Sequence, residues 1–205
     1  VLNSGPTAAT VDSVLEAQQV LNMINTKYLI INPSGQPLMN SLAMGHAWIV
    51  KDFLVVNNAD EEIAALAVTD LNEVAVVDQR FAGLLSGALK HEVGSGSVEL
   101  TEYRPNYLSY KASLDQQSLL VFSDVYYEGG WHASIDGEPV PHLRANYLLR
   151  ALPVDAGQHT IEFEFVFKPF EKGENISLAG SILVLLILLG GFGFHIYSNV
   201  IRKPE

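Results

Sequence analysis

Residues 119–167 read LLVFSDVYYEGGWHASIDGEPVPHLRANYLLRALPVDAGQHTIEFEFVF, a series of short apolar runs separated by turn signals. An Asp-Gly pair, Asp136 and Gly137, stands between two extended runs. Both residues tolerate a positive φ, which predicts a hairpin at this point. From Ile161 to Phe167 apolar and polar residues alternate, which predicts a strand with one buried aromatic face and one exposed acidic face. Such a strand needs a facing sheet, so the stretch predicts half of a β-sandwich or a closed meander.

The rest of the chain divides by its secondary-structure pattern. Residues 1–93 mix short apolar strands with amphipathic helices, one of them preceded by a capping box of Asn58 and Glu61. We expect a small α+β lobe there. Residues 94–97, Gly-Ser-Gly-Ser, have the composition of a flexible linker, and residues 98–172 carry the regularly spaced short strands of an antiparallel β-sandwich. The predicted fold class is therefore α+β, with one further element at the C-terminus.

That element is a long apolar segment. No charged side chain occurs between Asn175 and Ile201, and about 20 apolar residues suffice for a helix that crosses a bilayer. We predict a transmembrane helix over residues 175–199, a short tail over residues 200–205, and the lipid bilayer as a partner. A buried core helix is the alternative. Basic residues flank both ends, so charge alone does not give the orientation.

Composition excludes several classes of function. The formal net charge of -11, without a cluster of Lys and Arg, argues against binding of nucleic acid. The absence of cysteine excludes disulfides, thiolate catalysis and cysteine-ligated metals. His132 and His142 flank the Asp136 hairpin but have no third ligand at a suitable spacing, so we expect no metal and no cofactor.

Six segments and the apolar C-terminal segment together carry a family resemblance. The six are VLNMINTKYLI (20–30), GHAWIV (45–50), TEYRPNYLSY (101–110), YYEGGWHASIDGEPVP (126–141), RANYLLRA (144–151) and AGQHTIEFEFVF (156–167). In this order they resemble the C-terminal region of the YfhO family of bacterial membrane proteins. The resemblance implies a parent protein with many spans that looks like a lipid-phosphosugar-dependent glycosyltransferase. It also implies the bacterial inner membrane, with the globular part on the periplasmic, extracytoplasmic side.

The sequence departs from that family pattern because the multi-span portion is absent from the chain. In transferases of this kind the catalytic acid is expected in an early extracytoplasmic loop, and no residue of this chain matches it. The acidic pairs of the chain, such as Glu61 and Glu62, are expected on solvated faces. We therefore assign no catalytic residue to this chain alone.

Aromatic and acidic residues between positions 119 and 167 form the candidate binding site. Tyr126, Tyr127 and Trp131, with Asp124 and Asp136, could form a platform on which a sugar stacks, because flat rings and carboxylates recognise carbohydrate. Alternation places the two tyrosines on opposite faces, so packing in the core is the plainer interpretation of this cluster.

Two further sets of residues are candidates for helix packing and for ion pairs. Gly190, Gly191 and Gly193, with His195 near the end of the apolar segment, could pack against a partner helix, or the glycines could simply be tolerated in the membrane. Two arginines are expected to form ion pairs with carboxylates of the sandwich. These ion pairs would join Arg144 and Arg150 to Glu138 and Glu128.

The sequence thus predicts a non-catalytic extracytoplasmic domain with one membrane anchor that supports a larger multi-span membrane assembly, whose transmembrane helices would be its partners. Two alternatives remain. One is the acceptor-binding portion of a polytopic glycosyltransferase, with a glycan as partner. The other is an accessory structural subunit of an unrelated energy-transducing, respiratory membrane complex.

Overall fold

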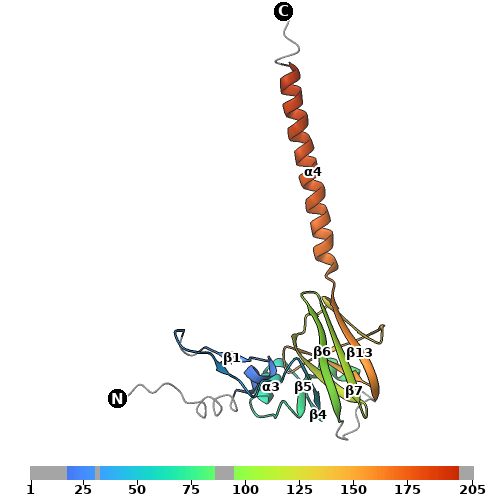
Figure 1. Cartoon of the computed structure of the whole chain (residues 1–205). Helices are drawn as coiled ribbons and strands as arrows, with labels where there is room; N and C mark the ends of the chain where they lie inside the picture. The colour runs from blue at the N-terminus through green and yellow to red at the C-terminus, as the bar shows by residue number, and fades with distance from the viewer. Residues whose placement is uncertain (1–17, 31–32, 86–94, 199–205) are drawn as a thin grey trace, which may run out of the picture. The chain divides into compact units, whose positions relative to one another are not determined.

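The computed structural model of the chain describes residues 18–30, 33–85 and 95–198 (Figure 1). The chain divides into two compact units, Val1–Phe165 and Val166–Glu205. The first unit contains the sheets and the short helices, and the second contains the long helix.

Two large sheets and a small ribbon make up the first unit. The central sheet contains, in spatial order, β3 (Ala47–Val50), β8 (Ser118–Val125), β12 (Leu149–Val154), β11 (Leu143–Ala145), β5 (Val74–Asp78) and β4 (Asp52–Val56). The outer sheet contains β10 (Glu138–Val140), β9 (Trp131–Ile135), β13 (Gly157–Phe165), β7 (Tyr107–Leu114) and β6 (Gly96–Arg104). The ribbon pairs β1 (Tyr28–Leu29) with β2 (Leu38–Met39). The short helices are α2 (Gln19–Met23), α3 (Ala59–Leu66) and the 3-10 helix η1 (Gln79–Leu84).

Both faces of the central sheet are buried at β8, which explains the unbroken apolar run from Leu119 to Phe122. Leu119 and Val121 belong to a hydrophobic cluster that includes residues of α2 and α3. Leu120 and Phe122, which alternate with them, belong to a second cluster shared with the outer sheet. A strand segment covered on both faces has no polar side to expose, so its four central residues, 119–122, are all apolar.

The outer sheet confirms the predicted hairpin and the predicted strand, although the strand ends at Phe165 rather than at Phe167. Asp136 and Gly137 have φ values of 53° and 85° and connect β9 to β10 as an antiparallel hairpin. In β13, Ile161 and Phe163 are fully buried, and the Phe163 ring meets the Phe122 ring edge-on at 4.8 Å between centroids. Aromatic pairs in this geometry are favourable beyond their buried area, and they join the two sheets into a sandwich.

The predicted α+β fold class is confirmed, with short helices in the N-terminal part, but the described strands β3, β4 and β5 of residues 1–93 do not form a sheet of their own. β3, β4 and β5 all come from that segment, yet they complete the central sheet: Ile49 lies opposite Leu120, and Val77 opposite Ala145. Gly96, from the predicted linker at residues 94–97, is the first residue of β6. The linker prediction fails because a short Gly-Ser run has no side-chain pattern that separates a loop from the start of an edge strand.

The parallel pair of the central sheet positions the candidate site. β4 runs parallel to β5, and α3 connects them. As predicted, Asn58 caps this helix: its side chain accepts a hydrogen bond from the backbone N–H of Glu61. In parallel α/β sheets ligands bind beyond the carboxyl ends of the strands, and η1, which follows β5 directly, stands at that end of the one parallel pair in the described part of the chain.

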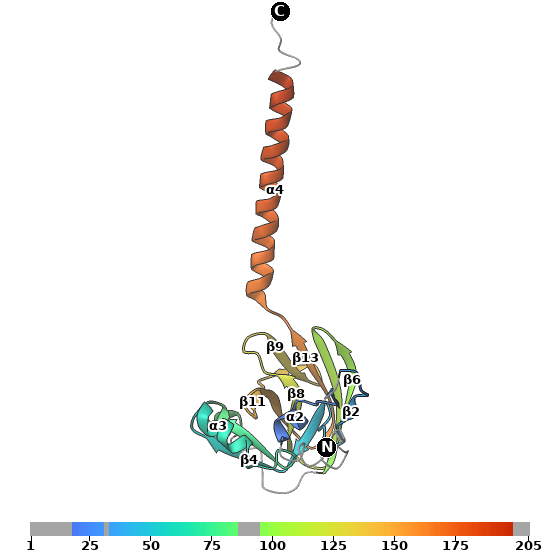
Figure 2. The same ribbon diagram turned by 90° about the vertical axis from the view of Figure 1, so that its left-hand side faces the viewer.

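The second unit contains the helix α4 (Lys168–Ile196) (Figure 2). Within the described part of the chain it is the one helix long and apolar enough to cross a membrane, over Lys172–Ile196. Pro169 stands in its first turn, where the missing N–H of proline costs no hydrogen bond. The predicted transmembrane helix is therefore present as a helix and begins several residues earlier than predicted.

Candidate functional site

The first residue of the candidate site is Glu62 of α3, whose carboxylate is fully buried. Its Oε1 accepts a hydrogen bond from the backbone N–H of Tyr147 at 2.7 Å, and its Oε2 accepts one from Arg144 Nη2 at 2.6 Å. Burial raises the pKa of Glu62, and the two donors oppose that effect. The expectation that Glu62 lies on a solvated face was wrong, because the helical period places it on the inner face of α3 with Ala65 and Leu66.

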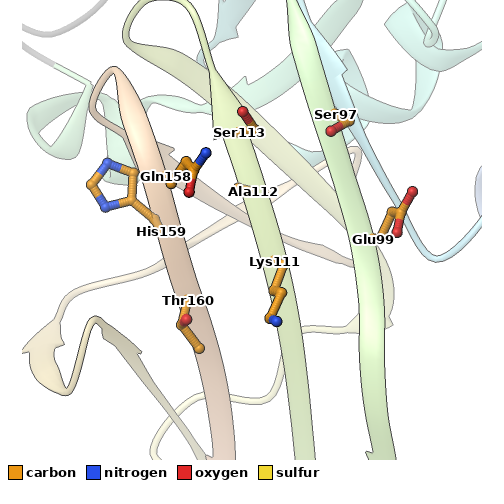
Figure 3. Close-up of a pocket in the computed structure, with 8 residues that line it drawn as sticks. All are labelled: Ser97, Glu99, Lys111, Ala112, Ser113, Gln158, His159 and Thr160. Atoms are coloured by element: carbon orange, nitrogen blue, oxygen red, sulfur yellow. The ribbon is translucent and has the colours of Figure 1, made fainter.

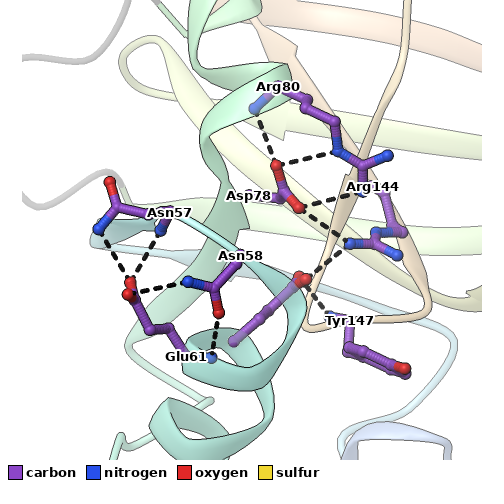
Figure 4. A network of polar contacts seen from close by, with 8 residues as sticks. Asn57, Asn58, Glu61, Asp78, Arg80, Arg144 and Tyr147 are labelled. Carbon is purple, nitrogen blue, oxygen red and sulfur yellow. Dashed lines mark hydrogen bonds and ion pairs between the residues drawn. The ribbon is translucent and has the colours of Figure 1, made fainter.

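Asp78 is the second buried carboxylate, at the end of β5. It caps η1 by accepting a hydrogen bond from the backbone N–H of Arg80, and Arg80 Nε and Nη2 reach its two oxygens at 3.1 and 3.0 Å (Figure 4). Arg144 Nη2 lies 3.5 Å from Asp78. The hydrogen bonds from Arg80 hold the pKa of Asp78 below its usual value. Two carboxylates and two guanidinium groups thus form one charge-balanced network.

The ion pairs predicted for the arginines need correction. Arg144 pairs with Glu62 and Asp78 rather than with the carboxylate of the nearby hairpin. Arg150 lies 3.5 Å from Asp124 and is itself 1% exposed. The predicted partners were close in the chain, whereas sheet pairing brings carboxylates from other segments to each guanidinium.

A strained turn carries the aromatic part of the site. Asn146 and Tyr147, between β11 and β12, have φ values of 49° and 70°. Asn146 is fully buried and pairs with Val76 twice: its Oδ1 accepts from the Val76 N–H at 2.8 Å, and its own N–H donates to the Val76 carbonyl at 2.7 Å. A positive φ at a bulky aromatic residue is unusual and is retained only where the surroundings enforce it.

The turn completes a pocket of about 430 Å³, a volume within the usual range for small-molecule sites. Its lining consists of Arg80, Phe81, Tyr126, Tyr127, Glu128, Arg144, Tyr147 and Leu148. The Phe81 ring meets the Tyr126 ring edge-on at 5.6 Å, and the Arg144 guanidinium carbon lies 5.4 Å from the centre of the Tyr147 ring. The pocket therefore presents aromatic faces beside guanidinium and carboxylate groups.

The structure places the residues predicted to contact a glycan in different surroundings, and Asp124 among them lies beside Arg150. Tyr126 and Tyr127 both line this pocket, and Tyr127 is 49% exposed. Trp131 packs in the sandwich, where the Arg150 guanidinium lies 4.2 Å from its ring centre. Asp136 lies in the β9–β10 turn, where it accepts a hydrogen bond from the Thr160 N–H.

The residues predicted to pack against a partner helix all lie on α4. A Cβ added to Gly190, Gly191 or Gly193 would meet no atom within 4 Å apart from its chain neighbours and the helix's own backbone. His195 stands in the last turn. Their role in helix packing stays a prediction.

A second hollow, of about 450 Å³, lies over strands β6, β7 and β13 of the outer sheet (Figure 3). Its lining residues are Ser97, Glu99, Lys111, Ala112, Ser113, Gln158, His159 and Thr160. The hollow lacks phenylalanine, tyrosine and tryptophan rings. Among the residues that the structure describes, no group of three or more His, Asp or Glu side chains converges as a metal site would require. The aromatic pocket is therefore the better candidate for a ligand.

Comparison with protein-family models identifies a relationship. The model described as "Bacterial membrane protein YfhO" matches residues 55–177, more than half of the chain. The chain belongs to the YfhO family. The matched range contains the whole aromatic pocket and the start of α4. Comparisons with curated proteins and with solved structures gave no match.

Membership confirms the predicted family and makes the chain a membrane protein domain with one candidate C-terminal span. The segments 20–30 and 45–50, which contributed to the resemblance, lie before the range that the YfhO model matches. The other four segments lie inside it.

Sequence reasoning missed the residues that hold the pocket in place from behind its lining, Glu62, Asp78 and Asn146, and it missed Tyr147 of the lining itself. Asp78 had a local signal, because it directly precedes a short helix and caps it. The Asn146–Tyr147 pair had another, because an asparagine between two short apolar runs favours a turn with positive φ. Glu62 had none, since its partners are more than 80 positions away in the sequence.

Proposed function

We propose that this YfhO-family domain is a non-catalytic extracytoplasmic module, anchored by α4, that supports a larger multi-span membrane assembly and receives a saccharide acceptor in its aromatic pocket. The observation that carries the proposal is the pocket itself. Tyr126, Tyr127 and Tyr147 line it together, and Tyr147 belongs to a turn with positive φ. Strain retained beside a pocket is typical of a binding site.

The chemistry of the lining favours a sugar. Aromatic faces stack on the apolar faces of a pyranose ring, and planar guanidinium groups donate to hydroxyl oxygens in fixed directions. The network of Glu62, Asp78, Arg80 and Arg144 carries two negative and two positive groups. It offers no excess positive charge for a phosphate, so an uncharged saccharide suits the pocket best.

The same contacts argue for binding rather than catalysis. Glu62 is 0% exposed and both of its oxygens accept hydrogen bonds from the protein. Asp78 is held ionised by Arg80. A general acid or base must reach the proton that it transfers, and these two carboxylates are occupied in holding the pocket together.

Family membership supports the wider setting. The YfhO family suggests a membrane glycosyltransferase as the parent protein, in the bacterial inner membrane with this domain on the periplasmic side. In that setting the pocket would hold the acceptor saccharide while the spans carry out the transfer. The domain contributes substrate positioning, and the reactive groups come from the rest of the assembly.

Binding to an array of hexose and N-acetylhexosamine oligosaccharides tests the proposal, with the full chain in detergent micelles. We expect Tyr127→Ala to weaken binding about tenfold, the equivalent of about 1.4 kcal/mol. Tyr103→Ala is the matched control, because Tyr103 is an exposed tyrosine, 66% accessible, on β6 outside the pocket. The wild type failing to bind any oligosaccharide, or both variants binding equally, contradicts a saccharide site in this pocket.

A further inference from the structure

The β1–β2 ribbon exposes apolar side chains outside both large sheets. Tyr28, Ile30 and Met39 are 62%, 68% and 69% exposed. Tyr28 of β1 lies directly opposite Met39 of β2. These two side chains therefore share one part of the surface, since residues opposite each other in an antiparallel pair point to the same face.

Hydrogen bonds fix the base of the ribbon. The buried Asn40 donates from its side chain to Asn22 Oδ1 at 3.0 Å and to the Thr26 carbonyl at 2.8 Å. Its backbone N–H donates to the Lys27 carbonyl at 2.8 Å. The exposed side chains are thus presented from an ordered base, and less conformational entropy is lost when they are covered.

The charge of this region differs from that of the rest of the chain. Residues 17–51 contain no Asp or Glu, and before Lys51 they contain one charged residue, Lys27. The chain as a whole has a formal net charge of -11. The ribbon therefore carries no carboxylate that would repel an anionic lipid headgroup.

We propose that the β1–β2 ribbon lies in the lipid–water interface of the bilayer that α4 crosses. Only Val166 and Phe167 separate the end of β13 from the start of α4, so the chain between the domain and the membrane helix is short. A tyrosine with aliphatic neighbours and one lysine suits an interface, where amphipathic rings lie at headgroup level and lysine reaches anionic lipid. The contact goes beyond the saccharide proposal and does not depend on it, and the ribbon precedes the range matched by the family model.

Fluorescence quenching by lipids tests the contact on the full chain. The protein has no cysteine, so Met39→Cys can be labelled at one site with an environment-sensitive fluorophore and reconstituted in vesicles of phosphatidylcholine and phosphatidylglycerol. Ser113→Cys is the control, an exposed position on the outer sheet. We expect brominated lipid to quench the label at position 39 at least twofold more than the label at position 113.

Three results would overturn the proposal. Equal quenching at the two positions would mean that the ribbon has no special contact with lipid. No quenching at position 39, with free access to aqueous iodide, would place the ribbon in water. Shielding of position 39 from both iodide and brominated lipid would assign the ribbon to a protein partner instead. A second label at Ile30→Cys should repeat the result for Met39→Cys, because both side chains are exposed on the ribbon.

Discussion

Glu62 connects the helix α3 to the turn that carries Tyr147, through hydrogen bonds to the Tyr147 backbone and to Arg144. Its side chain has no access to solvent. Removal of one partner from a buried ion pair leaves the other charge without compensation, and that loss is larger than the net stabilisation by the pair. The residue therefore determines both local stability and the position of the pocket wall.

We predict that Glu62→Ala lowers the free energy of unfolding by on the order of 2–4 kcal/mol, the lower end reflecting the partial exposure of Arg144. Urea denaturation followed by circular dichroism measures the change. Asp60→Ala, at an exposed position of the same helix, is the control and should change stability by less than about 0.5 kcal/mol. Equal effects of the two substitutions would show that the buried network is not what holds the turn.

His142 gives the domain a pH dependence. Burial lowers the pKa of His142 from 6.5 to about 4, and the positive charges of Arg150 and His132 act in the same direction. The ring lies against Tyr126 at 5.2 Å and Phe163 at 5.7 Å. The unfolded chain binds a proton near pH 6.5 and the folded chain only near pH 4, so the contribution of neutral His142 is lost as the pH falls through that interval.

We predict that this loss reaches up to about 3 kcal/mol at pH 4, because each unit of pKa difference corresponds to about 1.36 kcal/mol. His142→Phe keeps an aromatic ring at the position and removes the titration. Urea midpoints for the wild type and the variant between pH 7 and pH 4 should therefore diverge as the pH falls, with the variant less sensitive to acid. Parallel curves would exclude His142 as the source of the acid sensitivity.

At the level of elements, a substitution in the β11–β12 turn should change ligand binding more than it changes stability. Tyr147 has a φ of 70°, which costs on the order of 1–2 kcal/mol for a residue with a Cβ. Glycine removes that cost, but it also removes the packing of the ring and raises the conformational entropy of the unfolded chain. The two effects oppose each other in stability, whereas loss of the ring can only weaken ligand binding.

We predict that Tyr147→Gly changes the free energy of unfolding by less than about 1 kcal/mol and weakens saccharide binding about tenfold. The control is Tyr107→Gly, in β7, where φ is not positive and where glycine should destabilise the strand. Denaturation and binding are measured on the same preparations. A strong loss of stability in Tyr147→Gly would show that the turn is not strained.

Elements with local signals were predictable from the sequence, and their assembly was not. The capping box at Asn58 and the Asp136–Gly137 hairpin depend on residues within a few positions, and both were predicted. The pairing of Val77 with Ala145 depends on no local pattern, because short strands of similar composition compete for the same sheet edge. For that reason the predicted boundary between lobe and sandwich, at residues 94–97, does not coincide with the division of the strands between the two large sheets.

The residues of the candidate site were likewise predictable only in part. Tyr126 and Tyr127 were chosen by residue type and do line the pocket. Trp131, chosen on the same ground, packs beneath Arg150 instead. Residue type indicates what a side chain can contact, and only the fold decides whether it faces a pocket or the core.

At the level of the whole molecule, α4 should determine where the chain resides. The helix has no Asp, Glu, Lys or Arg from Asn175 to its end at Ile196, and each arginine placed at the centre of a span opposes insertion by about 2.5–3.5 kcal/mol. We predict that the double substitution Leu185→Arg and Leu186→Arg releases the chain from membranes washed at alkaline pH. Phe170→Arg, near the polar start of α4, should remain with the membranes. Retention of the double variant would mean that something other than this helix anchors the chain.

The central claim is that an anchored domain binds a saccharide in the pocket of Tyr126, Tyr127 and Tyr147 without transforming it. Saturation-transfer NMR on the full chain in nanodiscs tests this most directly, with an N-acetylhexosamine oligosaccharide as ligand. We expect magnetisation to pass from the protein to the sugar ring protons, to fall sharply in Tyr127→Ala, and no product signals to form over the course of the measurement. Equal transfer in the wild type and in Tyr127→Ala, or new sugar signals from turnover by the chain alone, would contradict the account.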